Sequence, residues 1–543
     1  MTVFSRFSGA RLAGVAIVAL TAIAAPVNFV GAQTLGQNER AERAFAQSLA
    51  IAASEDPAIA GFFRDRNYRP FWTSPDQAAR RASLLTALDG AEAHGLPVVR
   101  YRVGDLISSF GAARTEGDRG RLEVAMTRAF LSYAQDLQSG ALEPGKVVSA
   151  IKREVPRRDP REMLDSFAMA DAETYLEGLV PRSQSYVQLM KAKLELEKVI
   201  AHDGWGATVS AGSLKPGATG AAVIALRDRL QAMGYLGRSA TASYDGSLQK
   251  AVQRFQTDHG LDQDGIAAAA TISEINIGPQ ERLRSVLVAL ERERWMNIDR
   301  GARHIWVNLT DFTAKIIDNG KVTLATRAVV GAPNKGKPTP EFSHAMTYME
   351  VNPDWTVPGG IIKRDYLPRL KANPNALGHL QVIDRRGRVV PRSAINFANY
   401  SARNFPFNLR QPPGRSNALG RVKFMFPNPY AIYLHDTPDK HLFQRDVRAF
   451  SAGCVRLNNP FEFAYELLSR QDANPKKLFH DVLDSGRQER IFLETPVPVH
   501  LNYFTAFVGP KGRMNYRRDV YGRDAAIYDA LRKAGVSPEA DRS

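Results

Sequence analysis

YLHDTP at residues 433–438 and, after a polar loop, AFSAGCVRLNNP at residues 449–460 carry the side chains on which a catalytic interpretation of this chain rests. Cys454 is the only cysteine in the 543 residues, so it has no disulfide partner within the chain and no second thiolate for a metal site. His435 follows a predicted strand at residues 430–434, and the loop behind it can set the imidazole beside the thiol. Because a thiol of ordinary pKa is mostly protonated at neutral pH, such a base would activate it.

The residues around Cys454 decide between a reactive and a structural cysteine. A lone cysteine is usually a small buried apolar side chain. Here Ser451, Gly453, Arg456 and Asn458 lie beside it, whereas a structural cysteine would lie among aliphatic residues. Gly453 lets a substrate approach the backbone closely, and Arg456 would place a positive charge near the thiol. The composition of this segment therefore favours a reactive cysteine.

These motifs resemble the signature of the L,D-transpeptidases, the YkuD catalytic domain, in which a strand-end histidine precedes a loop and Ser-x-Gly-Cys-x-Arg with an Asn soon after. The stretch QPPGRSNALGRVKFMFPN at residues 411–428, taken with YLHDTP, is similar to the large multidomain YcbB-like branch. Most of the family has a His before the Gly-Cys pair, where this chain has Ala452. The YcbB-like branch also lacks that His, which leaves His435 as the only candidate base in the motif.

The resemblance implies a covalent acyl-transfer mechanism. Cys454 would attack the carbonyl that links the diamino acid to the terminal D-alanine of a tetrapeptide stem, and His435 would serve as general base and acid. Backbone N–H groups near Gly453 and Cys454 would hold the oxyanion. The candidate site residues are the catalytic pair Cys454 and His435, the oxyanion and loop residues Gly453, Ser451 and Ala452, and the substrate-binding residues Arg456, Asn458, Tyr433 and Trp355. Ordering of the loop is an equal alternative for Arg456 and Asn458, and Asp436 is a candidate third member beside the histidine.

The acceptor of the acyl group is left open. The resemblance implies the side-chain amine of a second stem, which gives a 3–3 cross-link, and it implies that carbapenems acylate the cysteine. An L,D-carboxypeptidase, or an enzyme that attaches a lipoprotein to the wall or cuts it off, would use the same thiol chemistry. A non-catalytic wall-binding scaffold is the third alternative. Peptidoglycan is the expected partner, other cell-wall synthases are further candidates, and no metal or cofactor is expected.

Residues 1–32 predict a cleaved secretory signal, because Arg6 and Arg11 precede an apolar run and small residues precede Gln33. An uncleaved amphipathic anchor is the alternative. No other stretch is long and apolar enough to span a membrane, so the expected location is the periplasm, with membrane contact only through the signal. The formal net charge of +16 suits a polyanionic surface such as a cell wall. Export argues against nucleic acid as a partner.

The first half of the chain predicts two helical domains. Apolar residues recur at helical spacing between residues 35 and 200, which predicts a helical scaffold domain at 33–205. Residues 210–278 resemble a peptidoglycan-binding domain built of three short helices. Whether this module binds glycan is open, because similarity of fold does not establish a site.

The second half predicts a β-rich catalytic domain, so the expected fold class is multidomain α+β. The apolar period becomes two near residue 305, and Asn319-Gly320 between two alternating runs predicts a hairpin. The catalytic domain is placed at residues 300–510, with residues 352–429, which hold Trp355, as a long irregular insertion that forms a lid over the cysteine. Residues 511–543 are expected to complete a hairpin and to form a last helix and a tail.

Overall fold

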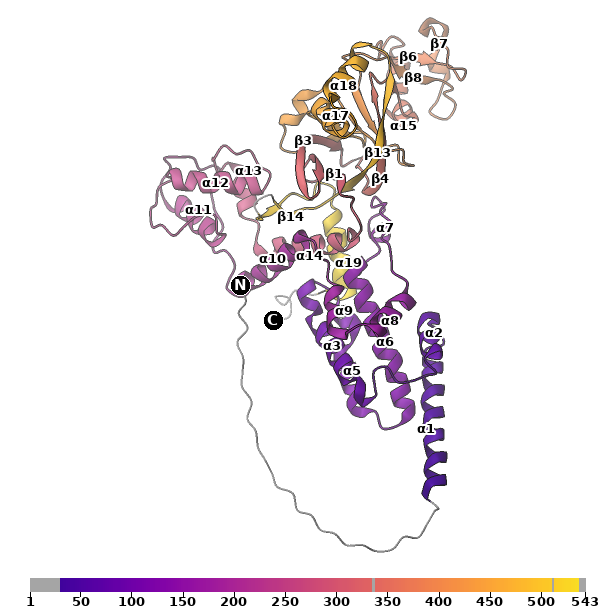
Figure 1. Ribbon diagram of the computed structural model, residues 1–543. Coiled ribbons are helices and arrows are strands. Elements are labelled where there is room, and N and C mark those ends of the chain that lie inside the picture. Colours follow the sequence, from indigo (N-terminus) through magenta and orange to yellow (C-terminus); the bar gives the residue numbers. More distant parts are fainter. Residues whose placement is uncertain (1–29, 335–336, 510–511, 537–543) are drawn as a thin grey trace.

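A computed structural model describes residues 30–334, 337–509 and 512–536. The predicted signal lies outside the described residues up to residue 29, and the predicted tail lies outside them beyond residue 536. Within the described ranges, no helix combines the length and the apolar character needed to cross a membrane. The predicted fold class is confirmed, with a helical N-terminal region and a β-rich C-terminal domain (Figure 1). The limits of the individual domains stay predictions.

The N-terminal region consists of helices around one apolar core. They are α1 (Val30–Ala52), α2 (Pro57–Asp65), α3 (Ala78–Asp89), α4 (Val98–Tyr101), α5 (Val103–Ala112), α6 (Glu116–Ser139), α7 (Pro144–Val147), α8 (Pro160–Met169) and α9 (Ala172–Gly178). Helix α6 begins with a capping box in which Thr115 and Asp118 each satisfy the other's backbone amide. The buried carboxylate of Glu123 on this helix accepts the amides of Phe71 at 2.9 Å and Trp72 at 3.0 Å. These contacts fix an aromatic cluster against α6 and make it part of the core.

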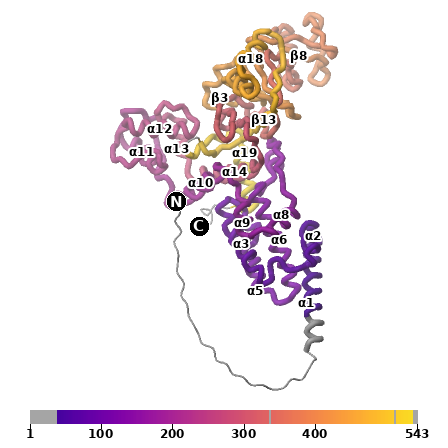
Figure 2. The backbone as a smooth tube through the Cα atoms, in the orientation of Figure 1, coloured from indigo at the N-terminus to yellow at the C-terminus, as the bar shows by residue number. Residues whose placement is uncertain are grey.

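A small three-helix unit follows, as the sequence predicts. It comprises α11 (Ala221–Ala232), α12 (Gly246–Asp258) and α13 (Ala269–Ile275). Leu226 on α11, Phe255 on α12 and Ile275 on α13 are at most 1% exposed and belong to its own core. The backbone trace shows this unit to one side of the molecule, next to the region where the helical and β-rich parts meet (Figure 2).

Helix α14 (Pro279–Trp295), which no predicted domain included, joins the parts of the molecule. Its core is shared with α10 (Gln184–Ala201), with the antiparallel pair β14 (Ala506–Val508) and β15 (Met514–Tyr516), and with α19 (Arg523–Ala534). Arg292 on α14 binds Glu341 at 2.6 Å and Asp524 at 3.2 Å, and Arg523 binds the second Glu341 oxygen at 2.8 Å. These buried charges compensate one another. The C-terminal segment is thereby fixed between α14 and the chain that leads into β4.

The strands of the β-rich domain pair around a closed ring. They are β1 (Arg303–Asn308), β2 (Thr313–Asp318), β3 (Lys321–Gly331), β4 (Phe342–Val351), β9 (Val422–Met425), β10 (Leu434–His435), β11 (Ala449–Ser451), β12 (Val455–Leu457) and β13 (Glu489–Asn502). The order β3-β12-β10-β9-β4-β13-β1-β2 returns to β3 through the β2–β3 pairing, and β11 pairs in parallel with the end of β3. The predicted hairpin at Asn319-Gly320 is confirmed, and both turn residues have positive φ, 48° and 77°. Helices α17 (Pro460–Leu468) and α18 (Pro475–Asp484) contribute Phe463 and Phe479 to the core of this domain.

Within the predicted insertion at residues 352–429, residues 355–411 form a folded unit while β9 belongs to the ring, so the prediction of an irregular section is wrong. Its sheet has the order β5-β8-β6-β7, with β5 (Trp355–Thr356), β8 (Asn408–Gln411), β6 (Gln381–Ile383) and β7 (Val389–Val390), next to α15 (Gly359–Ile361) and α16 (Leu367–Ala372). Val357, Leu370 and Leu409 lie in a core of its own. The strands are two to four residues long, too short for an alternating pattern to be recognised. Figure 1 shows the insertion at the end of the molecule opposite the helical region.

Candidate active site

Strand β10 brings the two sequence motifs together. It pairs in parallel with β12, with Leu434 opposite Val455 and His435 opposite Arg456. Leu434 and Val455 are 0% exposed and belong to the core of the domain. Because neighbouring residues of an extended strand point to opposite faces, the residues on either side of these two share the other face. The imidazole of His435 and the thiol of Cys454 therefore project from the same side of the sheet.

A turn stabilised by Asn428 shortens β10, and this corrects the predicted strand at residues 430–434. The side-chain oxygen of Asn428 accepts the amides of Tyr430 at 3.1 Å and Ile432 at 3.3 Å, and its nitrogen donates to the Ile432 carbonyl at 2.7 Å. Ala431 has a φ of 53°, which is costly for a residue with a side chain. Side-chain hydrogen bonds of this kind compete with strand pairing. The result is a bent backbone that presents the Ala431 carbonyl 3.6 Å from Cys454 Sγ.

The surroundings of Cys454 keep its thiol protonated. Burial raises the pKa of Cys454 above its ordinary value, although the amide and hydroxyl of Tyr433, together with the charges of Lys423 and Arg456, oppose the rise. Burial and the neighbouring cysteine in turn raise the pKa of Tyr433, so its phenol stays protonated and can donate to the sulfur. The resting site therefore holds a neutral thiol that several donors can stabilise as a thiolate once its proton leaves.

This electrostatic environment predicts how the reactivity of the thiol depends on pH. Between about pH 6 and pH 8, the rate of alkylation by iodoacetamide is expected to rise close to tenfold for each pH unit, because the fraction of thiolate rises in that proportion below a raised pKa. Mass analysis follows the reaction directly, since Cys454 is the only cysteine. A rate that levels off below pH 7 would instead indicate a preformed thiolate–imidazolium pair.

His435 is held as a neutral base. Its side chain is 4% exposed, and its Nδ1 donates to the carbonyl oxygen of Asp436, which places the proton of the neutral ring on Nδ1; the backbone of Leu419 is a second polar neighbour of the ring. Burial and the charge of Arg456 lower the pKa of His435 to about 3, although the carbonyl of Asp436 acts in the opposite direction. The ring is therefore neutral at physiological pH. Once protonated, it would be a strong acid that gives its proton away readily.

The side chain of Asp436 is not the third member of a catalytic group. Its Oδ2 accepts the amide of Arg421 at 2.8 Å, and its Oδ1 accepts Lys440 Nζ at 2.8 Å. Only the backbone carbonyl of Asp436 reaches the histidine. As expected for adjacent strand residues, the carboxylate points away from the face that His435 occupies.

Ser451 shapes the turn that carries the cysteine. Its hydroxyl donates to the Cys454 carbonyl at 2.6 Å and accepts the Gly453 amide at 3.1 Å. The Gly453 N–H is therefore already used, which narrows the expected oxyanion donors to the Cys454 N–H, for which the described residues provide no acceptor. Ala452 is exposed on the same turn. Gly453 has a φ of 132°, a conformation that only glycine adopts readily.

Thr339 supports this turn from outside the motif. Its buried hydroxyl donates to the Gly453 carbonyl at 2.7 Å and accepts the Gly331 amide at 2.9 Å. Tyr521, from the C-terminal segment, donates its hydroxyl to the Gly331 carbonyl at 2.6 Å. The chain end thus contributes to holding the cysteine loop in place.

Replacing Thr339 with valine is expected to lower both the thermal stability and the rate at which Cys454 is acylated. The change keeps the volume of the side chain but leaves the Gly453 carbonyl and the Gly331 amide without their partner, at a cost of about 1–3 kcal/mol for each buried group. Thermal melting and the rate of carbapenem acylation measure the two effects. A Thr339→Ser variant, which retains the hydroxyl, should stay close to the unmodified protein; equal losses in both variants would exclude the hydrogen bonds as the cause.

A row of charged residues, with the neutral His435 among them, crosses the sheet beside the site. In register order from β13 to β12 it contains Arg490, Glu350, Lys423, His435 and Arg456. Lys423 Nζ lies 3.3 Å from a Glu350 carboxylate oxygen and 4.5 Å from the centre of the Tyr433 ring. A positive charge is thereby fixed against the phenol that contacts the sulfur, and Glu350 compensates it from the side away from the thiol.

Arg456 and Asn458 order the loop between the two motifs. Arg456 Nη1 donates to Asp439 at 2.9 Å, and the Asn458 carbonyl accepts Lys440 Nζ at 3.1 Å. Arg456 Nε is buried and has no partner among the described residues. The side chain of Arg456 and the backbone of Asn458 thus make the loop-ordering contacts expected of one alternative, and the free donor of Arg456 leaves room for a substrate. His441 on this loop is exposed.

Trp355 lies apart from these residues, within the insertion. It pairs with Gln411 in the small sheet, packs on the core of the insertion and lies 6.3 Å from the Tyr366 ring between ring centres. A position over the cysteine therefore stays a prediction. Thr339, Ala431 and Tyr521 are the contributors that sequence reasoning missed, and Lys423, which was expected in the positive lining of the insertion, lies on β9 of the ring. Of these, only Ala431 had a signal, the Asn-Pro-Tyr turn that precedes it.

Comparisons with known proteins identify the parts of the chain. Family models match residues 302–499 as the L,D-transpeptidase catalytic domain (YkuD), residues 57–192 as a scaffold domain and residues 219–275 as a "Putative peptidoglycan binding domain". A curated Haemophilus influenzae protein named "Putative L,D-transpeptidase" is 33% identical over 242 residues, which are 44% of this chain and 48% of the relative. The match thus spans about half the length of that relative.

Two solved structures are also similar to this chain in part. The L,D-transpeptidase of Xylanimonas cellulosilytica is 14% identical, with a TM-score of 0.17, and the alignment covers 54% of this chain and 98% of that one. The L,D-transpeptidase of Stackebrandtia nassauensis is 14% identical, with a TM-score of 0.21, and the alignment covers 55% and 98%. On the three family matches, the chain contains a YkuD L,D-transpeptidase catalytic domain, a scaffold domain and a peptidoglycan-binding domain.

Proposed function

We propose that this protein is a periplasmic L,D-transpeptidase that joins peptidoglycan stem peptides through an acyl-enzyme on Cys454. The donor is a tetrapeptide stem, which loses its terminal D-alanine, and the product is a 3–3 cross-link. The observation that carries the proposal is the strand register, because it sets the only thiol and a neutral buried histidine on one face of the sheet. The predicted export signal and the peptidoglycan-binding domain are consistent with a substrate in the cell wall.

The proposed acylation step uses the groups around the thiol. Nε2 of His435 takes the proton of Cys454, and the thiolate attacks the donor carbonyl to form a C–S bond. The negative charge on the oxygen is held by the Cys454 N–H. The C–N bond to D-alanine then breaks, and the imidazolium gives its proton to the leaving amine. The low pKa of His435, about 3, makes the first transfer, from a thiol of raised pKa, uphill and favours the second, because the protonated ring is a strong acid.

Deacylation repeats the same proton movements in reverse. The side-chain amine of a second stem attacks the thioester carbonyl and gives a proton to His435. The C–S bond breaks and the thiolate recovers that proton, so that the free thiol and a new amide result. Water in place of the amine would give an L,D-carboxypeptidase with the same residues. The choice between these acceptors depends on which of them reaches the thioester first.

Arg456, Lys423 and Asn458 are proposed to bind the stem. Stem peptides carry carboxylates, and the two cations lie on the face of the sheet that holds the thiol. The buried Nε of Arg456, which lacks a partner among the described residues, is a donor that a substrate carboxylate or amide can satisfy. Tyr433 would direct the acyl group toward the sulfur from the position just before β10.

Incubation with a purified disaccharide tetrapeptide tests the proposed function. Mass analysis should reveal a dimer that has lost one D-alanine, with D-alanine released in equal amount. A tripeptide product without dimer would identify a carboxypeptidase instead. No reaction, with sacculus binding retained, would leave the wall-binding scaffold as the function.

The insertion is proposed to cover the bound stem, and Trp355 provides the test. A Trp355→Ala variant is expected to need about tenfold more substrate for half its maximal rate, while its alkylation by iodoacetamide stays unchanged, because only the large substrate uses the cover. Steady-state kinetics and the alkylation rate measure the two. If the reaction with the stem substrate and the alkylation by iodoacetamide slowed equally, the substitution would have disrupted the domain. The proposal that the insertion acts as a lid would then be withdrawn.

A further inference from the structure

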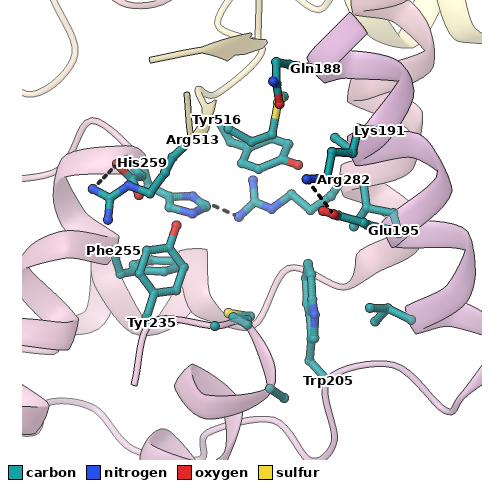
Figure 3. A pocket seen from close by; sticks show the side chains of 18 of the residues that line it. Gln188, Lys191, Glu195, Trp205, Tyr235, Phe255, His259, Arg282, Arg513 and Tyr516 are labelled. Carbon is teal, nitrogen blue, oxygen red and sulfur yellow. Dashed lines mark hydrogen bonds and ion pairs between the residues drawn. The ribbon is translucent and has the colours of Figure 1, made fainter. Parts of the chain in front are cut away.

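A cleft of about 610 Å³ lies between helix α10, the three-helix unit and strand β15 (Figure 3). Neither Cys454 nor His435 lines it, so it is separate from the candidate active site. Its volume falls within the range of about 300–1,000 Å³ that is typical of ligand pockets. Helix α10, the three-helix unit and the hairpin of β14 and β15 each supply part of its wall. The cleft therefore forms only when these parts of the chain pack together.

One wall of the cleft is a fixed stack of aromatic rings. The rings of Phe255 and His259 lie 3.8 Å apart between centres and 16° from parallel, and Tyr516 continues the stack 5.5 Å from His259. Tyr235 packs edge-on against Phe255, and Trp205 projects from the linker before α11 toward the same space (Figure 3). Phe255, His259 and Tyr516 are buried, so the half-buried rings of Tyr235 and Trp205 are the ones that a ligand can reach.

The charges in the cleft are mainly positive. Its lining contains the cations Lys191, Lys198, Arg282 and Arg513 and the carboxylates Glu195 and Asp258. Arg282 is only 5% exposed, and its guanidinium extends toward the middle of the cleft, 4.8 Å from the Tyr516 ring (Figure 3). Its Nη2 is held by Glu274 at 2.8 Å, which fixes the side chain and leaves the other nitrogens without a partner among the described residues. Lys191 and Lys198 are exposed on α10 and border the cleft.

We propose that this cleft is a second binding site for peptidoglycan, distinct from the site of cross-linking. The apolar faces of the sugar rings would pack on Trp205 and Tyr235, and the carboxylates of a stem peptide would pair with the exposed lysines Lys191 and Lys198. The combination of aromatic faces and cations fits a polymer that alternates sugar and acidic peptide better than it fits either alone. The identity of the polymer rests on the proposed function, whereas the existence of the cleft does not.

The glycan would contact a composite cleft, meaning one that the three-helix unit does not form alone, since α10 and β15 supply lining residues that this unit lacks. A glycan strand bound in this cleft would stay tethered to the protein while its stem peptides react one after another at Cys454. Such tethering raises the local concentration of stems without any change at the catalytic residues.

Co-sedimentation with isolated sacculi tests the site on the full chain at one fixed salt concentration. A Lys191→Glu/Lys198→Glu variant is expected to need about tenfold more protein for half-saturation. The control is Arg238→Glu/Lys250→Glu, which changes the net charge equally at exposed module residues outside the lining and should bind as the unmodified protein does. A Trp205→Ala variant, which leaves the charge unchanged, should also bind more weakly at an unaltered melting temperature.

Two results would overturn the proposal. Equal weakening in both charge-reversed variants would mean that sacculi attract any basic surface of the protein, and undiminished binding by Lys191→Glu/Lys198→Glu would mean that the cleft takes no part. Full binding by a folded Trp205→Ala variant would overturn it as well. Release of D-alanine from the soluble disaccharide tetrapeptide, measured with the unmodified protein alone, tests the proposed function separately, so either idea can fail without the other.

Discussion

Replacing Cys454 with alanine is expected to stop the release of D-alanine altogether, with a loss of at least about 10⁴-fold. The thiolate is the only group in the site that can form the covalent intermediate, and the hydrogen bonds around the turn do not depend on it. Ser451 binds the backbone carbonyl of Cys454, and Thr339 binds the carbonyl of Gly453. Mass analysis of a tetrapeptide incubation measures the loss, and thermal melting should be almost unchanged because the side chain is only half-buried.

A Cys454→Ser variant is the matched control for shape. Its hydroxyl occupies nearly the same space, but an alcohol ionises far less readily than a thiol, so acylation should stay at least about 10³-fold slower than in the unmodified protein. Sacculus binding should be retained in both variants, since the cysteine does not line the composite cleft. If the alanine variant still produced cross-linked dimers, the covalent mechanism would have to be given up.

The parts of the fold that depend on local sequence could be predicted. Asn319-Gly320 marks its hairpin because both positions need positive φ. Pro460 begins α17, as the preference of proline for the first helical position predicts, although Asn459 before it makes no side-chain capping bond. The candidate catalytic residues were also accessible, because the chemistry of a lone thiol among polar neighbours is local to its segment. The matching family model covers that segment within residues 302–499.

The parts that depend on distant contacts could not be predicted. Thr339 and Gly453 lie 114 residues apart, and no local pattern links a threonine hydroxyl to one particular carbonyl. The many charged residues of helix α14 indicate a surface helix, yet the helix is buried on nearly all sides. Its charges are tolerated there because Glu341 and Asp524, which are distant in sequence, pair with Arg292. The positive φ of Ala431 could not be predicted from the residue itself either, because the hydrogen bonds of the Asn428 side chain impose it.

Replacing His435 with asparagine is expected to slow carbapenem acylation of Cys454 by about 10³-fold at neutral pH. Asparagine can still donate to the Asp436 carbonyl, as Nδ1 does now, but it offers no nitrogen that accepts a proton. The thiol, whose pKa burial keeps high, then loses the base proposed for it. The acylation rate is read from the mass of the intact protein, and thermal melting confirms that the buried position still packs.

The pH dependence of this variant separates the two proton transfers of His435. Bulk hydroxide can form the thiolate at high pH, so alkylation by iodoacetamide, which needs only the thiolate, should approach the rate of the unmodified protein above about pH 9. Acylation by a carbapenem should remain slow even there, because the leaving nitrogen still lacks the proton that the imidazolium supplies. Recovery of both reactions at high pH would restrict His435 to removing the thiol proton. Near-normal acylation at neutral pH would mean that another group serves as the base.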